Sequence, residues 1–98
     1  MTYMTKPARG EIWLVRFDPK VGDEIEKDRP AVVVREDGLG RLALWIVVPI
    51  TDWKDRYRQF PWHTKIAPTS QNGLSKDSSA DSIQVKSVSE KRFLSRSS

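Results

Sequence analysis

The stretch RLALWIVVPIT, residues 41–51, narrows most strongly what this chain can fold into. Successive side chains of a β-strand point to opposite faces of its sheet. One face of this strand would carry Leu42, Leu44, Ile46, Val48 and Ile50, and the other Ala43, Trp45, Val47, Pro49 and Thr51. Both faces are largely apolar, and both must be covered. The pattern therefore predicts a central strand of a small barrel.

Four further segments have the β-branched, aromatic and alternating composition of short strands, namely residues 10–17, 30–36, 63–68 and 81–88. Five short strands with little helix favour a strongly bent barrel, and SH3-like and OB-like barrels both fit this count. We therefore expect a mainly β fold with short helices.

The last strand and the segment after it carry more detailed expectations. In residues 81–88 we expect Ile83 and Val85 to point inwards, and Gln84 to lie on the outward face. Residues 89–98 resemble a short helix with Ser89 as its N-cap and with Val88 packed on Phe93 as a hydrophobic staple.

The connecting segments differ in character. Residues 18–29 hold Pro, Gly and eight charges without a helical apolar stripe, so we expect a long loop. Pro30 would occupy the first position of the strand that follows. Residues 51–62 interrupt the strand pattern and are expected to hold one helical turn.

Composition excludes several classes of chemistry. The 98 residues make one domain, spanning 1–98, with a net charge of +4 that fits a nucleic-acid partner without requiring one. There is no cysteine and one histidine, so a disulfide, a thiol nucleophile and a zinc site are not expected. We expect no metal and no cofactor. No apolar run reaches the roughly 20 residues of a membrane span. We expect a cytoplasmic protein without a membrane partner.

Few residues offer chemistry from their type alone. The run WKDRYRQFPW, residues 53–62, interleaves cations with aromatic rings, as surfaces that bind single-stranded nucleic acid do. The same aromatic residues would also serve as core or dimer-interface anchors. His63 is either an ordinary strand residue or a functional one. The carboxylates Asp23, Glu24 and Glu26 are either a catalytic set or the charges of a solvated loop.

The ordered set of motifs resembles a known family. The runs RGEIWLVRFDPKVGDEIEKDRPAVVV, VVPIT, NGLSKDSS and QVKSVSEKRF, spanning roughly residues 9–94, are similar to the MazF/PemK toxin endoribonucleases. The resemblance implies an SH3-like barrel of the MazF/CcdB type and a homodimer. It also implies a toxin of a type II toxin–antitoxin system that cuts single-stranded mRNA in a sequence-specific, metal-independent way, and a MazE-like antitoxin as partner.

The resemblance also implies site residues. Arg29 and Thr51 match the catalytic pair of the family: a guanidinium can bind two oxygens of a phosphorane-like transition state, and a threonine hydroxyl can position the attacking 2′-hydroxyl. Glu24 and Gln84 match RNA-contacting positions, and Lys86 shares the face of Gln84. The remaining expected RNA contacts are Lys27, Trp53, Lys54 and Arg56.

Two other functions stay open at the level of sequence. A CcdB-like toxin that binds a protein target such as gyrase would share the fold without needing the Arg29/Thr51 pair. An inactive relative that binds RNA or antitoxin is suggested by Asp23 and Ile83, which stand where some relatives carry histidine and aspartate.

Overall fold

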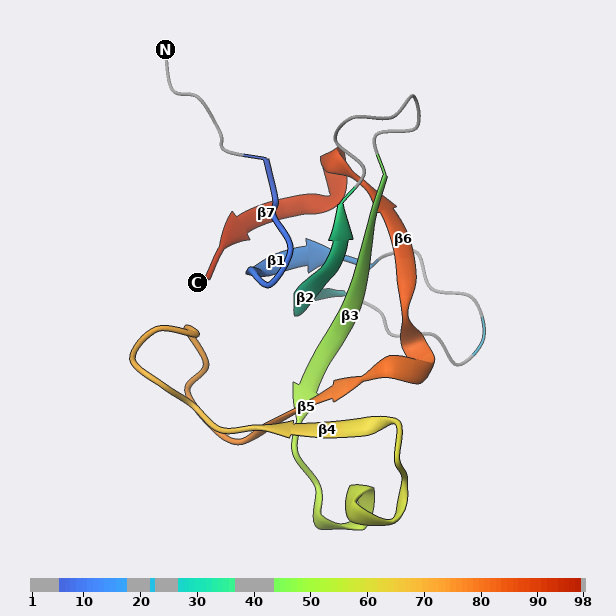
Figure 1. The fold of residues 1–98 in the computed structure, drawn as a ribbon, viewed down its shortest axis with the longest axis vertical. Helices are drawn as coiled ribbons and strands as arrows, with labels where there is room; N and C mark the ends of the chain where they lie inside the picture. Colours follow the sequence, from blue (N-terminus) through green and yellow to red (C-terminus); the bar gives the residue numbers. More distant parts are fainter. Residues whose placement is uncertain (1–5, 18–21, 23–26, 37–43, 98) are drawn as a thin grey trace.

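A computed structural model describes residues 6–17, 22, 27–36 and 44–97 of the chain. Seven strands and three short 3₁₀ helices are formed in these residues (Figure 1). In chain order they are β1 (Ile12–Arg16), β2 (Asp28–Glu36), β3 (Leu44–Asp52), η1 (Asp55–Gln59), β4 (His63–Ile66), β5 (Ser78–Asp81), η2 (Ser82–Gln84), β6 (Lys86–Ser89), η3 (Glu90–Arg92) and β7 (Phe93–Arg96).

All strand pairs given by the structure are antiparallel, and β3 is the strand on which the sheet is organised. The strand order is β4-β5-β3-β2-β1-β7, with β6 as a second partner of β3. The first half of β3 pairs with β6, from Leu44↔Ser89 to Val47↔Lys86, and its end pairs with β5, at Ile50↔Ala80. Figure 1 shows β3 running from the upper strands down to the β4–β5 hairpin. β3 therefore links two parts of the sheet.

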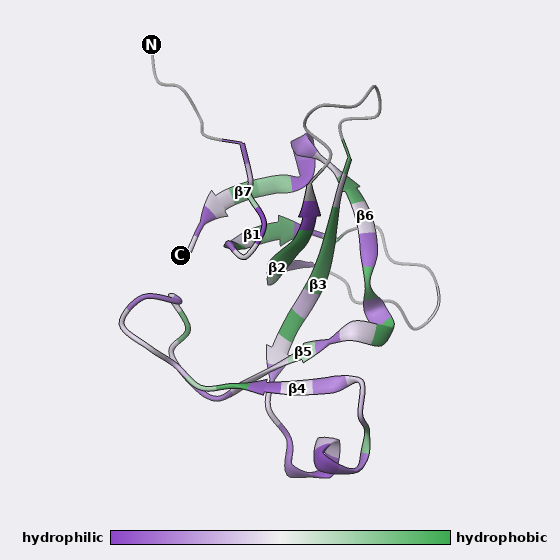
Figure 2. Cartoon of the chain, viewed as in Figure 1, coloured by the Kyte–Doolittle hydropathy of each residue, from purple (hydrophilic) through white to green (hydrophobic). Residues whose placement is uncertain are grey.

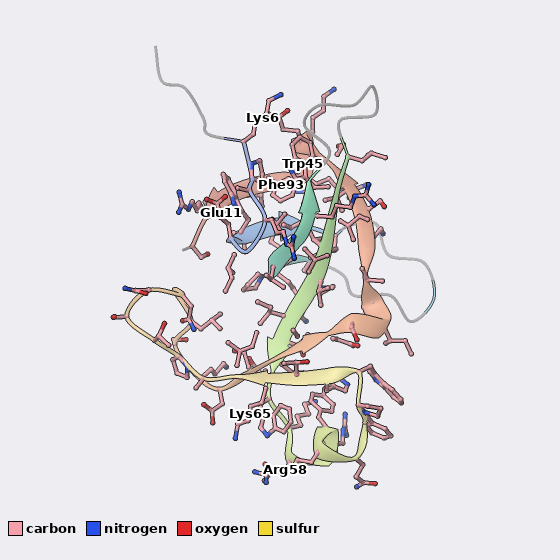
Figure 3. All side chains as sticks on the ribbon, viewed as in Figure 1. Lys6, Glu11, Trp45, Arg58, Lys65 and Phe93 are labelled. Atoms are coloured by element: carbon pink, nitrogen blue, oxygen red, sulfur yellow. The ribbon has the colours of Figure 1, made fainter. Side chains whose placement is uncertain are left out.

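The core lies in the upper part of the sheet and is built on aromatic residues. Phe93 packs edge-on against Trp13 and against Trp45, with ring centroids 5.7 and 5.8 Å apart. Trp45 is fully buried, and its indole Nε1 donates a hydrogen bond of 2.8 Å to the carbonyl oxygen of Pro7. Trp45 and Phe93 lie close together in Figure 3, and Figure 2 shows β1, β2 and β3 as the most hydrophobic strands. The predicted two-sided burial of the 41–51 segment is thus realised in β3, within residues 44–51.

The prediction of a mainly β fold with short helices is confirmed. The sheet path is open rather than closed, because no pairing in the described residues joins its end strands β4 and β7. None of the helices in the described part of the chain is long and apolar enough to cross a membrane.

The predicted strand over 81–88 is wrong, because it is two strands separated by a turn. The Asp81 side chain accepts a hydrogen bond of 3.2 Å from the Ile83 N–H and caps η2. Such a local side-chain bond competes with the sheet ladder and interrupts it. Ile83 and Val85, expected inside, are 64% and 50% exposed, and Gln84 lies in the turn rather than on the outward face of a strand.

The predicted C-terminal helix is also wrong. Only η3 is helical, its Ser89 makes no side-chain capping bond, and the chain continues as β7, which pairs with β1. The edge of β1 offers main-chain partners, and the strand conformation also delivers Phe93 to the two core tryptophans. Val88 and Phe93 both belong to the core, but they are members of two strands and not the staple of a helix.

Glu11 ties the first strand to the last. Its Oε1 accepts hydrogen bonds from the Ala8 N–H at 2.8 Å and the Trp13 Nε1 at 3.0 Å, and its Oε2 lies 3.2 Å from the Arg96 guanidinium. Burial raises the pKa of Glu11, but the bonds from Trp13 and Ala8 and the charge of Arg96 together lower it below its ordinary value of 4.5. The carboxylate is therefore favoured by folding.

Replacing Glu11 by glutamine is expected to remove a pH-dependent part of the stability. A lowered folded-state pKa adds stability above the unfolded-state pKa, and this contribution is lost as pH falls through the folded-state pKa. Urea unfolding at about pH 7 should show Glu11→Gln less stable than wild type by about 1 kcal/mol. The difference should shrink towards about pH 3, and a difference that stays constant over this range would contradict the assignment.

Candidate active site

The Arg29 side chain projects from the start of β2, on the core-facing side of the sheet. It is paired with the fully buried Val15 of β1, and it alternates onto the same face as the buried Ala31 and Val33. The side chain itself is only half-buried. The aliphatic stem of Arg29 therefore starts beside core residues, and the side chain extends to a cavity that it lines.

Pro30 separates Arg29 from the ladder that joins β2 to β3. A proline has no N–H to give to a neighbouring strand, and the β2–β3 ladder begins one residue later, at Ala31↔Pro49. The sequence pattern predicted Pro30 at the first position of the strand. This prediction is wrong, because β2 begins at Asp28 and Pro30 lies inside it. The pairing of Asp28 and Arg29 with β1 extends the strand backwards.

Thr51 faces Arg29 across the open end of this ladder. Extending the Ala31↔Pro49 register by two residues places Thr51 of β3 opposite Arg29, on the same face of the sheet. The other edge of β3 remains paired here, at Thr51↔Ser79 of β5. The two residues thus meet where β3 leaves β2 and continues with β5, and this partner exchange opens a site between them.

Two adjoining cavities share this pair. One, of about 270 Å³, is lined by Arg29, Thr51, Asp52, Lys54 and Tyr57. The other, of about 160 Å³, is also lined by the first three and extends over residues 73–76. Lys76 lines this second cavity, where its Nζ lies 3.0 Å from the Asp52 carboxylate. With Arg29, Lys54 and Lys76 against one carboxylate, the lining favours an anion.

The Arg29 guanidinium has an unusual hydrogen-bonding state. Its Nε is the one buried side-chain nitrogen or oxygen in the described part of the chain that has no hydrogen-bond partner. An unsatisfied buried donor costs about 1–3 kcal/mol, and native structures hold few of them. A donor that no described protein group satisfies calls for an explanation, and an anion bound in the cavity that Arg29 lines would supply the missing partner.

The sequence-predicted residues divide into two groups. Arg29, Thr51 and Lys54 come together at the cavities. Trp53 lies next to them, with its ring edge-on to Tyr57 at 5.8 Å and the Lys65 ammonium 5.3 Å from its centre. These rings therefore form a satellite cluster beside the site.

The other predicted contacts lie outside the lining of both cavities. Lys27 is exposed in the left-handed region, with φ 69°, just before β2, and Lys86 is in β6 opposite Val47. Arg56 is exposed, with its guanidinium carbon 5.6 Å from the centre of the Tyr57 ring. Gln84 lies in η2. Glu24 is outside the described residues.

Two contributions to the site were not among the expected RNA contacts. Tyr57 lines the larger cavity, and the segment 73–76 lines the smaller one. Asn72 organises this segment, since its side-chain oxygen accepts hydrogen bonds from the Thr69 and Leu74 N–H groups. The Asn-Gly pair at 72–73 signalled a turn, and Lys76 three residues later was the available signal for a cation in the site.

Chemically, this arrangement suits an anion with a neighbouring hydroxyl. An arginine fork binds two oxygens of a phosphate, and a threonine hydroxyl beside it both donates and accepts hydrogen bonds. Aromatic rings next to cations provide stacking surfaces for bases. The fold and the site together define a small β-barrel-type protein with a phosphodiester-sized, cationic cleft.

Comparison with known proteins agrees with this class. The family model of PemK-like, MazF-like toxins of type II toxin–antitoxin systems matches residues 8–97. Endoribonuclease MazF9 of Mycobacterium tuberculosis is 35% identical over 92 residues, covering 88% of this chain and 75% of that protein. Endoribonuclease PemK of Escherichia coli is 46% identical over 44 residues, covering 44% of this chain and 33% of that protein.

The fold has a solved counterpart. The crystal structure of MazF from Deinococcus radiodurans superimposes with a TM-score of 0.70 at 20% identity, covering 97% of this chain and 84% of that one. The chain belongs to the family of PemK-like, MazF-like toxins of type II toxin–antitoxin systems. The family resemblance and the MazF-type fold expected from the sequence are thereby confirmed.

Proposed function

We propose that this protein is an endoribonuclease that cuts single-stranded mRNA at short sequences without a metal ion. The observation that carries the proposal is the convergence of Arg29 and Thr51 on one cationic cavity, in a chain related to two proteins named as endoribonucleases. The 2′-oxygen would form a bond to the adjacent phosphorus while the bond to the 5′-oxygen breaks. The products would be a 2′,3′-cyclic phosphate and a 5′-hydroxyl.

Arg29 is assigned the role of stabilising the transition state of this reaction. Negative charge grows on the non-bridging oxygens as the fifth bond to phosphorus forms, and a fixed guanidinium stabilises it without reorganising. Because a guanidinium stays protonated, Arg29 is not the base that takes the 2′-proton. Thr51, on β3 opposite Arg29, is assigned to holding either a phosphate oxygen or the attacking 2′-hydroxyl.

Incubating the purified chain with a long single-stranded transcript in EDTA tests this function. Discrete fragments are expected, since sequence-specific cutting without a metal leaves defined ends. The same transcript annealed to its complement is the matched control and should remain intact. If varied single-stranded transcripts all stay whole, the proposed activity is wrong.

Partners and location follow from the same proposal. The family pairs each toxin with an antitoxin, and we propose a MazE-like protein that covers the cationic cleft with an acidic segment. We also propose a homodimer, supported by the exposed apolar side chains of Ile83 and Val85. Light scattering at micromolar concentration that gives the 11.3 kDa of one chain would contradict the dimer. Because the proposed substrate is mRNA, we propose that the protein acts in the cytoplasm.

A further inference from the structure

Tyr57 lines the cavity of Arg29 and Thr51 from a weakly supported position. It belongs to η1, a 3₁₀ helix of five residues, none of which is buried. Figure 3 places Arg58 of the same turn, and Lys65 of β4, at the lower end of the molecule, away from the Trp45–Phe93 core. A side chain on such a turn needs other contacts if it is to keep one orientation in the cavity wall.

Two aromatic side chains supply those contacts. The His63 ring lies flat on the Tyr57 ring, with centroids 3.7 Å apart and planes within 1° of parallel. The Trp53 ring meets Tyr57 edge-on, at 85°. The Arg56 guanidinium carbon lies 5.6 Å from the centre of the Tyr57 ring. Tyr57 is therefore packed before any ligand arrives.

His63 is in turn fixed to the sheet. Its Nδ1 lies 2.8 Å from the Oγ of Ser79, which is fully buried in β5. Ser79 is also the strand partner of Thr51. One buried residue thus anchors the contacts that hold Tyr57 and pairs with the strand that carries Thr51, so both walls of the cavity share one support.

We propose that Tyr57 contacts the bound RNA and that His63 is the positioning residue that holds it. This rests on the proposed function. A ring already ordered in the free protein adds no ordering cost to binding, whereas a loose ring adds about 0.5–1.5 kcal/mol, or about two- to tenfold in affinity. The stack on His63 supplies that order, and the bond to Ser79 fixes the stack.

Two substitutions of His63 separate these contacts. Asparagine keeps a polar atom near the position of Nδ1 for Ser79 but loses the ring, whereas phenylalanine keeps the ring and loses the bond. Binding is measured by anisotropy of a fluorescein-labelled RNA that carries a mapped cleavage site with a 2′-deoxyribose at the attacked position. His63→Asn should bind about three- to tenfold more weakly, and His63→Phe within about twofold of wild type.

Stability should follow the opposite order. His63→Phe leaves the buried Ser79 hydroxyl without its partner, so its urea midpoint should fall below that of His63→Asn. If His63 served stability alone, His63→Phe, the less stable variant, would bind RNA more weakly than His63→Asn. That result would overturn the positioning role.

A double-mutant cycle completes the test. Tyr57→Ala should weaken binding at least about tenfold, and adding His63→Asn should weaken it no further, because His63 acts through Tyr57. Wild-type affinity in Tyr57→Ala, with wild-type cleavage intact, would overturn this inference and leave the proposed function standing. A wild-type chain that neither binds nor cuts RNA would overturn the proposed function itself.

Discussion

Replacing Arg29 by alanine is expected to reduce RNA cleavage at least about a hundredfold and to leave the fold intact. Removing one preorganised donor to a transition-state oxyanion costs about 10²–10³ in rate. The buried Nε has no partner in the described part of the chain, so its removal breaks no hydrogen bond there, and lost packing of the stem is the expected cost. The free energy of unfolding measured by urea titration should therefore stay within about 1 kcal/mol of wild type, while initial cleavage rates fall.

Two matched variants sharpen this result. Arg29→Lys keeps the charge but not the two-pronged fork, so it should recover only part of the rate. Arg35→Ala removes an exposed arginine from the same strand and should cleave as wild type does. Full activity in Arg29→Ala would remove Arg29 from the mechanism. Growth inhibition that persists in cells without RNA cleavage would favour a protein target, as in CcdB-like toxins.

Replacing Trp45 by alanine should have the largest effect on stability. Its ring is fully buried and contacts Phe93, and its Nε1 is bonded to the Pro7 carbonyl. Truncating a buried aromatic residue costs about 3–5 kcal/mol, a large share of the 5–15 kcal/mol that holds a typical domain. Urea unfolding followed by circular dichroism should show this loss, or no cooperative transition at all.

The controls for Trp45 separate packing from hydrogen bonding. Trp45→Phe retains much of the ring and loses the bond to Pro7, so about 1–3 kcal/mol should be lost. Trp53→Ala removes a half-buried tryptophan of the satellite cluster and should cost less than Trp45→Ala. A loss below about 1 kcal/mol in Trp45→Ala would show that the core is not organised around this residue.

The fold could be predicted where alternation alone decides it. The two apolar faces of the 41–51 segment predicted a central strand, and β3 is that strand. Prediction failed where a local bond or a distant partner decides: the Asp81 cap splits one expected strand, and the edge of β1 turns an expected helix into β7. Neither competitor is visible in the window of residues that forms the element.

The site shows the same division. Arg29 and Thr51 were found through the family resemblance, and the register of β2 and β3 explains why they meet. Tyr57 and His63 stack only because β4 pairs with β5 and η1 folds back on it, which no spacing in the sequence reveals. Interleaved cations and rings indicated the region, and the tertiary contacts select the residues.

The chemistry of the cut ends tests the central claim most directly. Fragments made by the wild-type chain in EDTA can be analysed by mass spectrometry and by labelling with polynucleotide kinase. We predict a 2′,3′-cyclic phosphate on one fragment and a free 5′-hydroxyl on the other, because in the proposed reaction the 2′-oxygen attacks the phosphorus held by Arg29. Fragments with a 5′-phosphate and a 3′-hydroxyl would contradict it, since water would then have been the nucleophile.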